Sequence, residues 1–79
     1  MPAVALVPPK IVKDVMLRVG WVVFSEDSFN WVLLKNGVPL AVPKRGKLVA
    51  REVLENCLIE GQLSPGAFIE HCREVGHEF

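Results

Sequence analysis

The chain has 79 residues, 51% of them hydrophobic, and its nine Lys and Arg balance its nine Asp and Glu. This length allows one domain and leaves no room for a second core. Two cysteines are too few for a disulfide framework, and no stretch approaches the roughly 20 apolar residues that would cross a membrane. The apolar start lacks the basic residues, the length and the cleavage site of a signal peptide. We therefore expect a cytoplasmic protein with no membrane association.

Charge is distributed unevenly along the chain. Residues 1–51 contain eight of the nine Lys and Arg and only three acidic residues, whereas residues 52–79 contain one Arg and six Glu. A balanced net charge argues against nucleic-acid binding, but the basic N-terminal part could still face a phosphate backbone. The high apolar content of so small a domain also predicts surface that is covered by a second copy of the chain or by a partner protein.

The first predicted element is a helix that follows a proline-bounded lead-in. We expect residues 1–9 to be loosely held and residues 10–76 to form the domain. Pro9 suits the first turn of a helix, where its missing N–H is not needed, and Gly20 suits the end of that helix. Between them, apolar residues recur at helical spacing: Ile11, Val12, Val15, Met16 and Val19.

Three short strands are predicted next. The aromatic and β-branched residues of 21–24 are typical of a strand, and a polar turn over 25–28 separates it from a second strand over 29–35. Asn36-Gly37 is a strong signal for a tight hairpin into a third strand over 38–42. Pro39 cannot donate a hydrogen bond to a neighbouring strand, so the third strand should lie at an edge of the sheet.

The rest of the chain is predicted to be helical. After a basic turn over residues 43–47, apolar residues trace a helix that ends at Gly61: Val49, Val53, Leu54, Cys57 and Leu58. Ser64-Pro65 is typical of a helix start and opens a last short helix that ends at Gly76. The predicted order is α-β-β-β-α-α. This order gives an α+β domain, a three-stranded antiparallel sheet with helices packed on one face.

The residues that most often carry metals or catalysis form no recognisable constellation. Cys57, His71, Cys72 and His77 match no standard spacing of a structural zinc site, and neighbouring helix residues point in different directions. A Cys–His nucleophilic pair would lack an orienting third group. The glutamates after residue 51 read as a solvated helix face rather than as paired acid–base catalysts. We expect no metal and no cofactor.

The basic turn is a candidate nucleic-acid-binding segment. Lys44, Arg45 and Lys47 surround Gly46, and we expect them immediately before a helix N-terminus. Backbone N–H groups and the helix dipole favour an anion such as phosphate at that place, and three cations would add salt-sensitive contacts. An ordinary solvated loop explains the same residues equally well, so both interpretations stay open.

The second strand is apolar on both faces. Alternation puts one set of side chains on one face, Phe29, Trp31 and Leu33, and another set on the opposite face, Asn30, Val32 and Leu34. A three-stranded sheet with helices on one side leaves its other face open to water. We therefore predict a partner interface that includes Trp31, Val32 and Leu34. Stacking of Trp31 or Phe29 on nucleic-acid bases is the alternative use, and core packing is the commoner one.

Several of these features together resemble the HicA-type toxin family. They are Gly20-Trp21, the strand at Phe29–Leu34, Val42-Pro43, the basic turn, and Leu63-Ser64 followed by Phe68. The resemblance runs from about residue 11 to residue 68 and depends on the order and spacing of the features rather than on one motif. It implies a fold similar to a double-stranded-RNA-binding domain, the RNA-cleaving activity of an mRNA interferase, and a HicB-like antitoxin as partner.

The resemblance also implies where catalysis would lie. Members of the family typically carry Gly-Ser-His at the start of the second strand, and the position of their catalytic histidine corresponds here to Asn30, preceded by Ser28-Phe29. Residues 21–70 contain no histidine. An amide does not titrate near neutral pH, and loss of general acid–base help typically costs ~10²–10⁴-fold in rate. An engineered inactivation would leave the same residue, but Phe29 in place of a small residue favours natural divergence.

Three functions remain open on the sequence. The first is a HicA-like domain that binds RNA, an antitoxin or both, with lost or weakened ribonuclease activity. The second is a competent mRNA interferase that uses another catalytic group, or a deliberately silenced one. The third is a protein-interaction module that is unrelated to RNA and uses its apolar sheet face.

Overall fold

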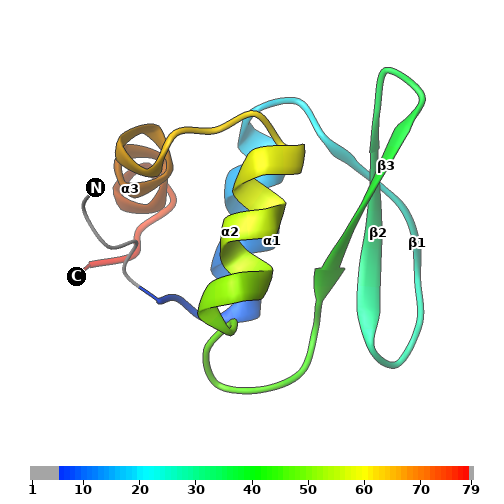
Figure 1. The fold of residues 1–79 in the computed structure, drawn as a ribbon, viewed down its shortest axis with the longest axis horizontal. Coiled ribbons are helices and arrows are strands. Elements are labelled where there is room, and N and C mark those ends of the chain that lie inside the picture. Colours follow the sequence, from blue (N-terminus) through cyan, green and yellow to red (C-terminus); the bar gives the residue numbers. More distant parts are fainter. Residues whose placement is uncertain (1–5, 79) are drawn as a thin grey trace.

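The computed structural model describes residues 6–78 of the chain. Its elements follow the predicted order α-β-β-β-α-α, so the predicted α+β fold is confirmed (Figure 1). The elements are α1 (Pro9–Arg18), β1 (Val22–Glu26), β2 (Asn30–Lys35), β3 (Val38–Pro43), α2 (Arg51–Glu60) and α3 (Pro65–Glu74).

The three strands form one antiparallel sheet in the order β1-β2-β3. The predicted hairpin joins β2 to β3, because Asn36 and Gly37 both have positive φ angles, 52° and 77°. The register pairs Lys35 with Val38 beside this hairpin and Asn30 with Pro43 at the other end of the two strands. β3 is an edge strand, as its Pro39 predicts.

The opposite edge of the sheet, β1, is exposed and irregular. All five of its residues are exposed. Val23 pairs with Leu33 and Ser25 pairs with the adjacent Val32, so Phe24 is an extra residue that forms a β-bulge. The bulge interrupts the regular pairing of β1 in its middle.

All three helices lie on one side of the sheet (Figure 1). α1 contacts β1 and β3, α2 contacts β3, and α3 packs on α1 farther from the sheet. The largest fully buried side chains come from helices and strands alike: Phe68, Met16, Leu33, Leu40 and Leu54. Among the described residues, no helix covers the opposite face of the sheet, so that face is open.

The second helix begins later than predicted. The apolar spacing places Val49 in the helix, but Val49 lies in the preceding loop, where its side chain is buried and its N–H donates to the Val7 carbonyl (2.9 Å). A buried loop residue can extend a helical pattern of apolar residues without being helical, because burial alone creates the pattern. Val7, which falls in the predicted lead-in, is itself fully buried. Residues 1–5 of that lead-in lie outside the described residues.

The first two strands begin one residue later than predicted. Trp21 precedes β1, and its backbone N–H donates to the Met16 carbonyl (3.0 Å), which ties it to the end of α1. Phe29 precedes β2, and its N–H donates to the Asp27 carboxylate (2.7 Å) within the turn. Both aromatic residues are typical of strands, but a local hydrogen bond to the preceding residues fixes each backbone outside the ladder.

Candidate nucleic-acid interface

One carboxylate holds the turn between β1 and β2. Asp27 Oδ1 accepts hydrogen bonds from the N–H groups of Phe29 (2.7 Å) and Asn30 (2.8 Å), and the Asp27 N–H donates to the Asn30 carbonyl (3.0 Å). The two N–H donors hold the pKa of the Asp27 carboxyl below its ordinary value, because they stabilise its ionised form. These bonds define the backbone geometry at the start of β2.

Asn30 lies beside the start of the predicted basic turn. It is half-buried and pairs with Pro43, the last residue of β3. The next residue, Lys44, donates its backbone N–H to the Phe29 carbonyl (2.8 Å). The fold therefore brings position 30 and the first cation of the basic turn to the same end of the sheet, although they are distant in sequence.

Lys44 is engaged by several neighbours. Its Nζ donates to Glu26 Oε2 (2.6 Å) and to the Asp27 carbonyl (3.0 Å), and it lies 5.7 Å from the centre of the Trp31 ring. The hydrogen bond from Lys44, followed by its positive charge, holds the pKa of the Glu26 carboxyl below its ordinary value. Glu26 is therefore ionised at neutral pH and offsets part of the charge of Lys44.

Arg45 covers an exposed aromatic ring. Its Nε donates to the Ser28 carbonyl (2.9 Å), and its guanidinium carbon lies 4.6 Å from the centre of the Phe29 ring, within the range of a cation–π contact. Phe29 is 61% exposed. A guanidinium has five N–H donors, so the bond to Ser28 leaves capacity for an outside acceptor such as phosphate.

A cation from α1 joins this group. Lys13 Nζ lies 4.6 Å from the centre of the Trp31 ring. Lys13 could not be assigned to this group from the sequence, because its helical position shows that it flanks the apolar face but not which strand residue it contacts. We call Lys13, Phe29, Trp31, Lys44 and Arg45 together the aromatic–cation cluster.

The last two residues of the basic turn are arranged differently from the expectation. Gly46 has a φ of 94°, which favours glycine, and Lys47 is exposed. α2 begins only at Arg51, so a loop separates these residues from the helix N-terminus that they were predicted to precede immediately. Lys44 and Arg45 therefore contact Trp31 and Phe29 rather than a helix N-terminus.

Charges nearly balance around the cluster. Four cations belong to it or to the basic turn, Lys13, Lys44, Arg45 and Lys47, and three carboxylates lie next to them, Asp14, Glu26 and Asp27. A polyanion would meet only a small net positive charge here. Binding at this place would therefore depend on stacking and on directed hydrogen bonds more than on long-range attraction.

The predicted partner residues fall on two faces of the sheet. Trp31 packs against the core on the helix-covered side, next to the fully buried Leu33 in the alternation of β2. Val32 and Leu34 alternate with them and lie half-buried on the open face. The register adds Val22 and Pro39 beside Leu34 on that face. The open face is therefore apolar along its middle strand, whereas Trp31 belongs to the aromatic–cation cluster.

The remaining titratable candidates lie elsewhere. His71 is on α3, away from the sheet, with its Nδ1 3.5 Å from the Glu74 carboxylate (Figure 1). Cys57 and Cys72 are free thiols, and burial raises the pKa of each to about 11.

Within residues 6–78, no three His, Cys, Asp or Glu side chains are grouped so that they could hold a metal ion. In the same part of the chain, no helix has the length and apolar character needed to cross a membrane.

Comparison with known proteins gives no relative: no protein-family model, no curated protein and no solved structure matches the chain. The candidate site is therefore defined by its own geometry. Its central feature is the position of Asn30 beside two cations, each of which lies over an aromatic ring.

Proposed function

We propose that this chain is a HicA-like domain that binds RNA at the aromatic–cation cluster and does not cleave it. One observation supports the proposal above the others: Asn30, the position that corresponds to the family's catalytic histidine, lies at the same end of the sheet as Lys44 and Arg45. A histidine at this position could transfer protons next to cations suited to phosphate, whereas an amide there can only donate or accept hydrogen bonds.

The neighbouring groups do not replace a histidine. Glu26 is paired with Lys44 and Asp27 accepts two backbone N–H bonds, so the pKa of each carboxyl is lowered and both are ionised at neutral pH. A general acid needs a proton to give near the working pH, and neither carboxylate holds one. His71 belongs to α3 on the far side of α1 (Figure 1). Without acid–base help the cleavage rate should be lower by ~10²–10⁴-fold.

The cluster offers two kinds of contact to RNA. The exposed ring of Phe29 can stack on an unpaired base, a contact that contributes roughly 1–3 kcal/mol per base in proteins that bind single strands. Arg45 and Lys47 can bind the phosphates on either side, since Arg45 retains unused donors and Lys47 is exposed. These contacts favour single-stranded RNA over a continuous duplex, because stacking on Phe29 needs a base that is free of its own stack.

Binding and cleavage of a labelled single-stranded RNA test this proposal. The wild-type protein, Asn30→His and the matched amide variant Asn30→Gln are compared by fluorescence polarisation over a salt series and by denaturing gels. We expect all three to bind with an affinity that falls as salt rises, by a slope of about −0.7 per phosphate contact. Only Asn30→His should cleave, with an optimum near the pKa of histidine.

Three results would contradict all or part of the proposal. Degradation of RNA by the purified wild-type protein would show that another group performs catalysis, and the chain would then be an active mRNA interferase. If binding of the wild-type protein to RNA is undetectable or does not depend on salt, RNA is not the partner of the aromatic–cation cluster. If Asn30→His binds RNA but does not cleave it, position 30 does not correspond to the family's catalytic histidine. The chain would then be an RNA-binding domain without that relationship.

A second function, binding to a partner protein, is favoured by the open sheet face. Val32 and Leu34 of β2 and the exposed Val22 of β1 lie on or beside this face, and no described helix covers it. A HicB-like antitoxin or a second copy of the chain could bury these residues. Sedimentation of the wild-type protein and of Val32→Glu tests self-association: a dimer that Val32→Glu converts to a monomer supports it, and a wild-type monomer at high concentration excludes it.

A further inference from the structure

Trp21 is a buried indole with an unpartnered donor. The residue is 4% exposed, and its Nε1–H has no hydrogen-bond partner among residues 6–78. Most buried polar groups in proteins are paired, so an unpaired buried N–H indicates a place where an acceptor from outside the chain can bind. Trp21 lies between α1 and β1, far from the aromatic–cation cluster at the other end of β2.

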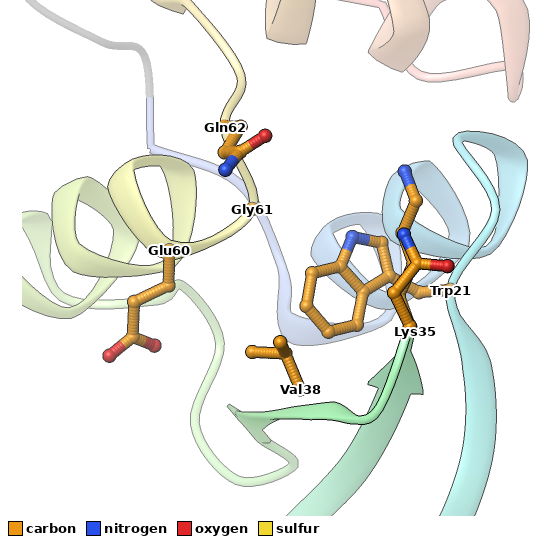
Figure 2. Close-up of a pocket in the computed structure, with 7 residues that line it drawn as sticks. Trp21, Lys35, Val38, Glu60, Gly61 and Gln62 are labelled. Carbon is orange, nitrogen blue, oxygen red and sulfur yellow. The ribbon is translucent and has the colours of Figure 1, made fainter.

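A small pocket adjoins this indole (Figure 2). Its volume is about 120 Å³, and its walls come from the β2–β3 hairpin and from the segment that follows α2. Binding sites for drug-sized ligands are typically about 300–1,000 Å³, so this pocket suits a single functional group with one or two carbons rather than a nucleotide.

Hydrogen-bond donors from three parts of the chain meet at the pocket. Besides Trp21, the lining residues include three with N–H donors in their side chains, Lys35, Asn36 and Gln62. Lys35 Nζ donates one hydrogen bond to the Val19 carbonyl (2.8 Å), and an ammonium has two further N–H groups. Figure 2 shows the indole nitrogen on the upper edge of the ring and the Glu60 carboxylate directed away from the indole.

We propose that this pocket binds a carboxylate group. One carboxylate oxygen accepts a hydrogen bond from Trp21 Nε1, and the other accepts from Lys35 Nζ, so the buried donor gains its partner and the ammonium gains a counter-charge. The indole ring and Val38 form an apolar wall for the carbon that bears the carboxylate. The indole nitrogen is buried, so a carboxylate reaches it only when a neighbouring side chain moves aside.

The carboxylate has two sources, a free small acid and the C-terminus of a polypeptide. The chemistry recognised is the same, and the size of the pocket admits only the end of either molecule. A phosphate is a poorer fit, because it carries a second negative charge at neutral pH and Lys35 is the one cation among the residues that line the pocket.

The two tryptophans allow a direct test by NMR of the ¹⁵N-labelled protein. Trp21 reports on the pocket and Trp31 on the aromatic–cation cluster, so failure of this proposal and failure of RNA binding are distinguishable. Sodium acetate is titrated against sodium chloride at equal ionic strength. We expect a saturable downfield shift of the Trp21 indole proton at millimolar acetate and no matching change at Trp31.

Variants and ligand pairs complete the test. Lys35→Gln should weaken acetate binding at least tenfold, while the matched control Lys10→Gln, an exposed lysine of α1, should leave it unchanged. A dispersed spectrum shows that each variant is folded. N-acetylglycine represents the C-terminus of a chain and N-acetylglycinamide is its uncharged control. Only N-acetylglycine should bind if a C-terminus is the source.

Three results would overturn the proposal: a Trp21 shift that is equally large with chloride or phosphate, a joint shift of both indole protons, or an unaltered affinity of Lys35→Gln for acetate.

Discussion

The ammonium of Lys44 contacts three neighbours at once. The Glu26 carboxylate and the Asp27 carbonyl accept its hydrogen bonds, and the Trp31 ring lies beside it. A cation held in this way has a fixed position but gives a weaker attraction to a polyanion than a free one. Removing the carboxylate should therefore strengthen RNA binding without changing where the lysine lies.

Glu26→Gln tests whether the Glu26 carboxylate weakens the attraction of Lys44 for RNA. It keeps the size of the side chain and removes the charge, so the RNA affinity should rise several-fold at low salt, and the salt slope should steepen by about 0.7, one phosphate contact on a single strand. The pKa of Glu26 is lowered, so its ion pair is present above the ordinary carboxyl pKa and is lost only when the pH falls through the lowered value. The gain should therefore be constant between about pH 6 and 8. Polarisation assays across that range measure it, and a gain that varies with pH would contradict the explanation.

Part of the candidate site could be predicted residue by residue. The basic turn is visible in the sequence because it is a short run of adjacent residues, whereas Asn30 was selected only by the resemblance to the HicA-type family. Lys13 and the pairing of Arg45 with Phe29 are not visible in the sequence, because such contacts depend on how α1 and the β1–β2 turn are placed against β3. Local patterns carry no information about that placement.

Gly61, at the end of α2, is required because there is no room for a side chain, and not because its backbone conformation favours glycine. Gly61 has an ordinary helical φ of −81°, but a Cβ there would lie 2.9 Å from the Cys57 carbonyl oxygen and 3.1 Å from the Met16 side chain. The left-handed residue of this turn is instead Gln62, with a φ of 58°. The two neighbours should therefore respond in opposite directions to substitution.

Gly61→Ala and Gln62→Gly test this assignment as a pair. Gly61→Ala should lower the free energy of unfolding by about 1–3 kcal/mol, because the added methyl group would lie too close to the Cys57 carbonyl oxygen and to the Met16 side chain. Gln62→Gly should raise it by about 0.5–1 kcal/mol, because relief of the left-handed backbone exceeds the entropic cost of glycine. Urea denaturation measures both, and the assignment is wrong if the two changes have the same sign.

Element boundaries were predicted best where a residue has one conformational role. Asn36-Gly37 fixed the hairpin, and Ser64-Pro65 fixed the start of α3, where the Ser64 hydroxyl accepts the Ala67 N–H (3.2 Å). Boundaries were displaced at Trp21, Phe29 and Val49, whose apolar side chains match the pattern of the element that follows each of them although their backbones lie outside it. At these positions long-range packing or a turn hydrogen bond decides the backbone, and neither is visible in local sequence.

At the scale of the whole molecule, the two thiols report on global unfolding. Cys57 of α2 and Cys72 of α3 are buried in one core, and the pKa of each is raised to about 11. At pH 8 only about one thiol in a thousand is then ionised, and the thiolate is the reactive form. The folded protein should therefore resist iodoacetamide at pH 8, and both cysteines should react together as urea unfolds it.

Mass spectrometry of the alkylated protein distinguishes the outcomes. Joint labelling at the same urea concentration fits a single cooperative core, whereas labelling of one cysteine alone would show that α2 or α3 opens separately. The raised pKa values also make stability fall as the pH rises from the ordinary thiol value of 9.0 towards 11, because the unfolded chain loses these protons first.

The extra residue at Phe24 affects how this molecule behaves in crowded solution. Another chain that tried to extend the sheet along β1 would find matched backbone groups for only two residues on either side of the bulge, Val22-Val23 and Ser25-Glu26. Such a short match gives too few hydrogen bonds to seed a growing fibril. The bulge therefore makes the exposed, apolar edge strand β1 a poor template for pairing with another chain. The exposed side chains of β1 remain available for specific recognition.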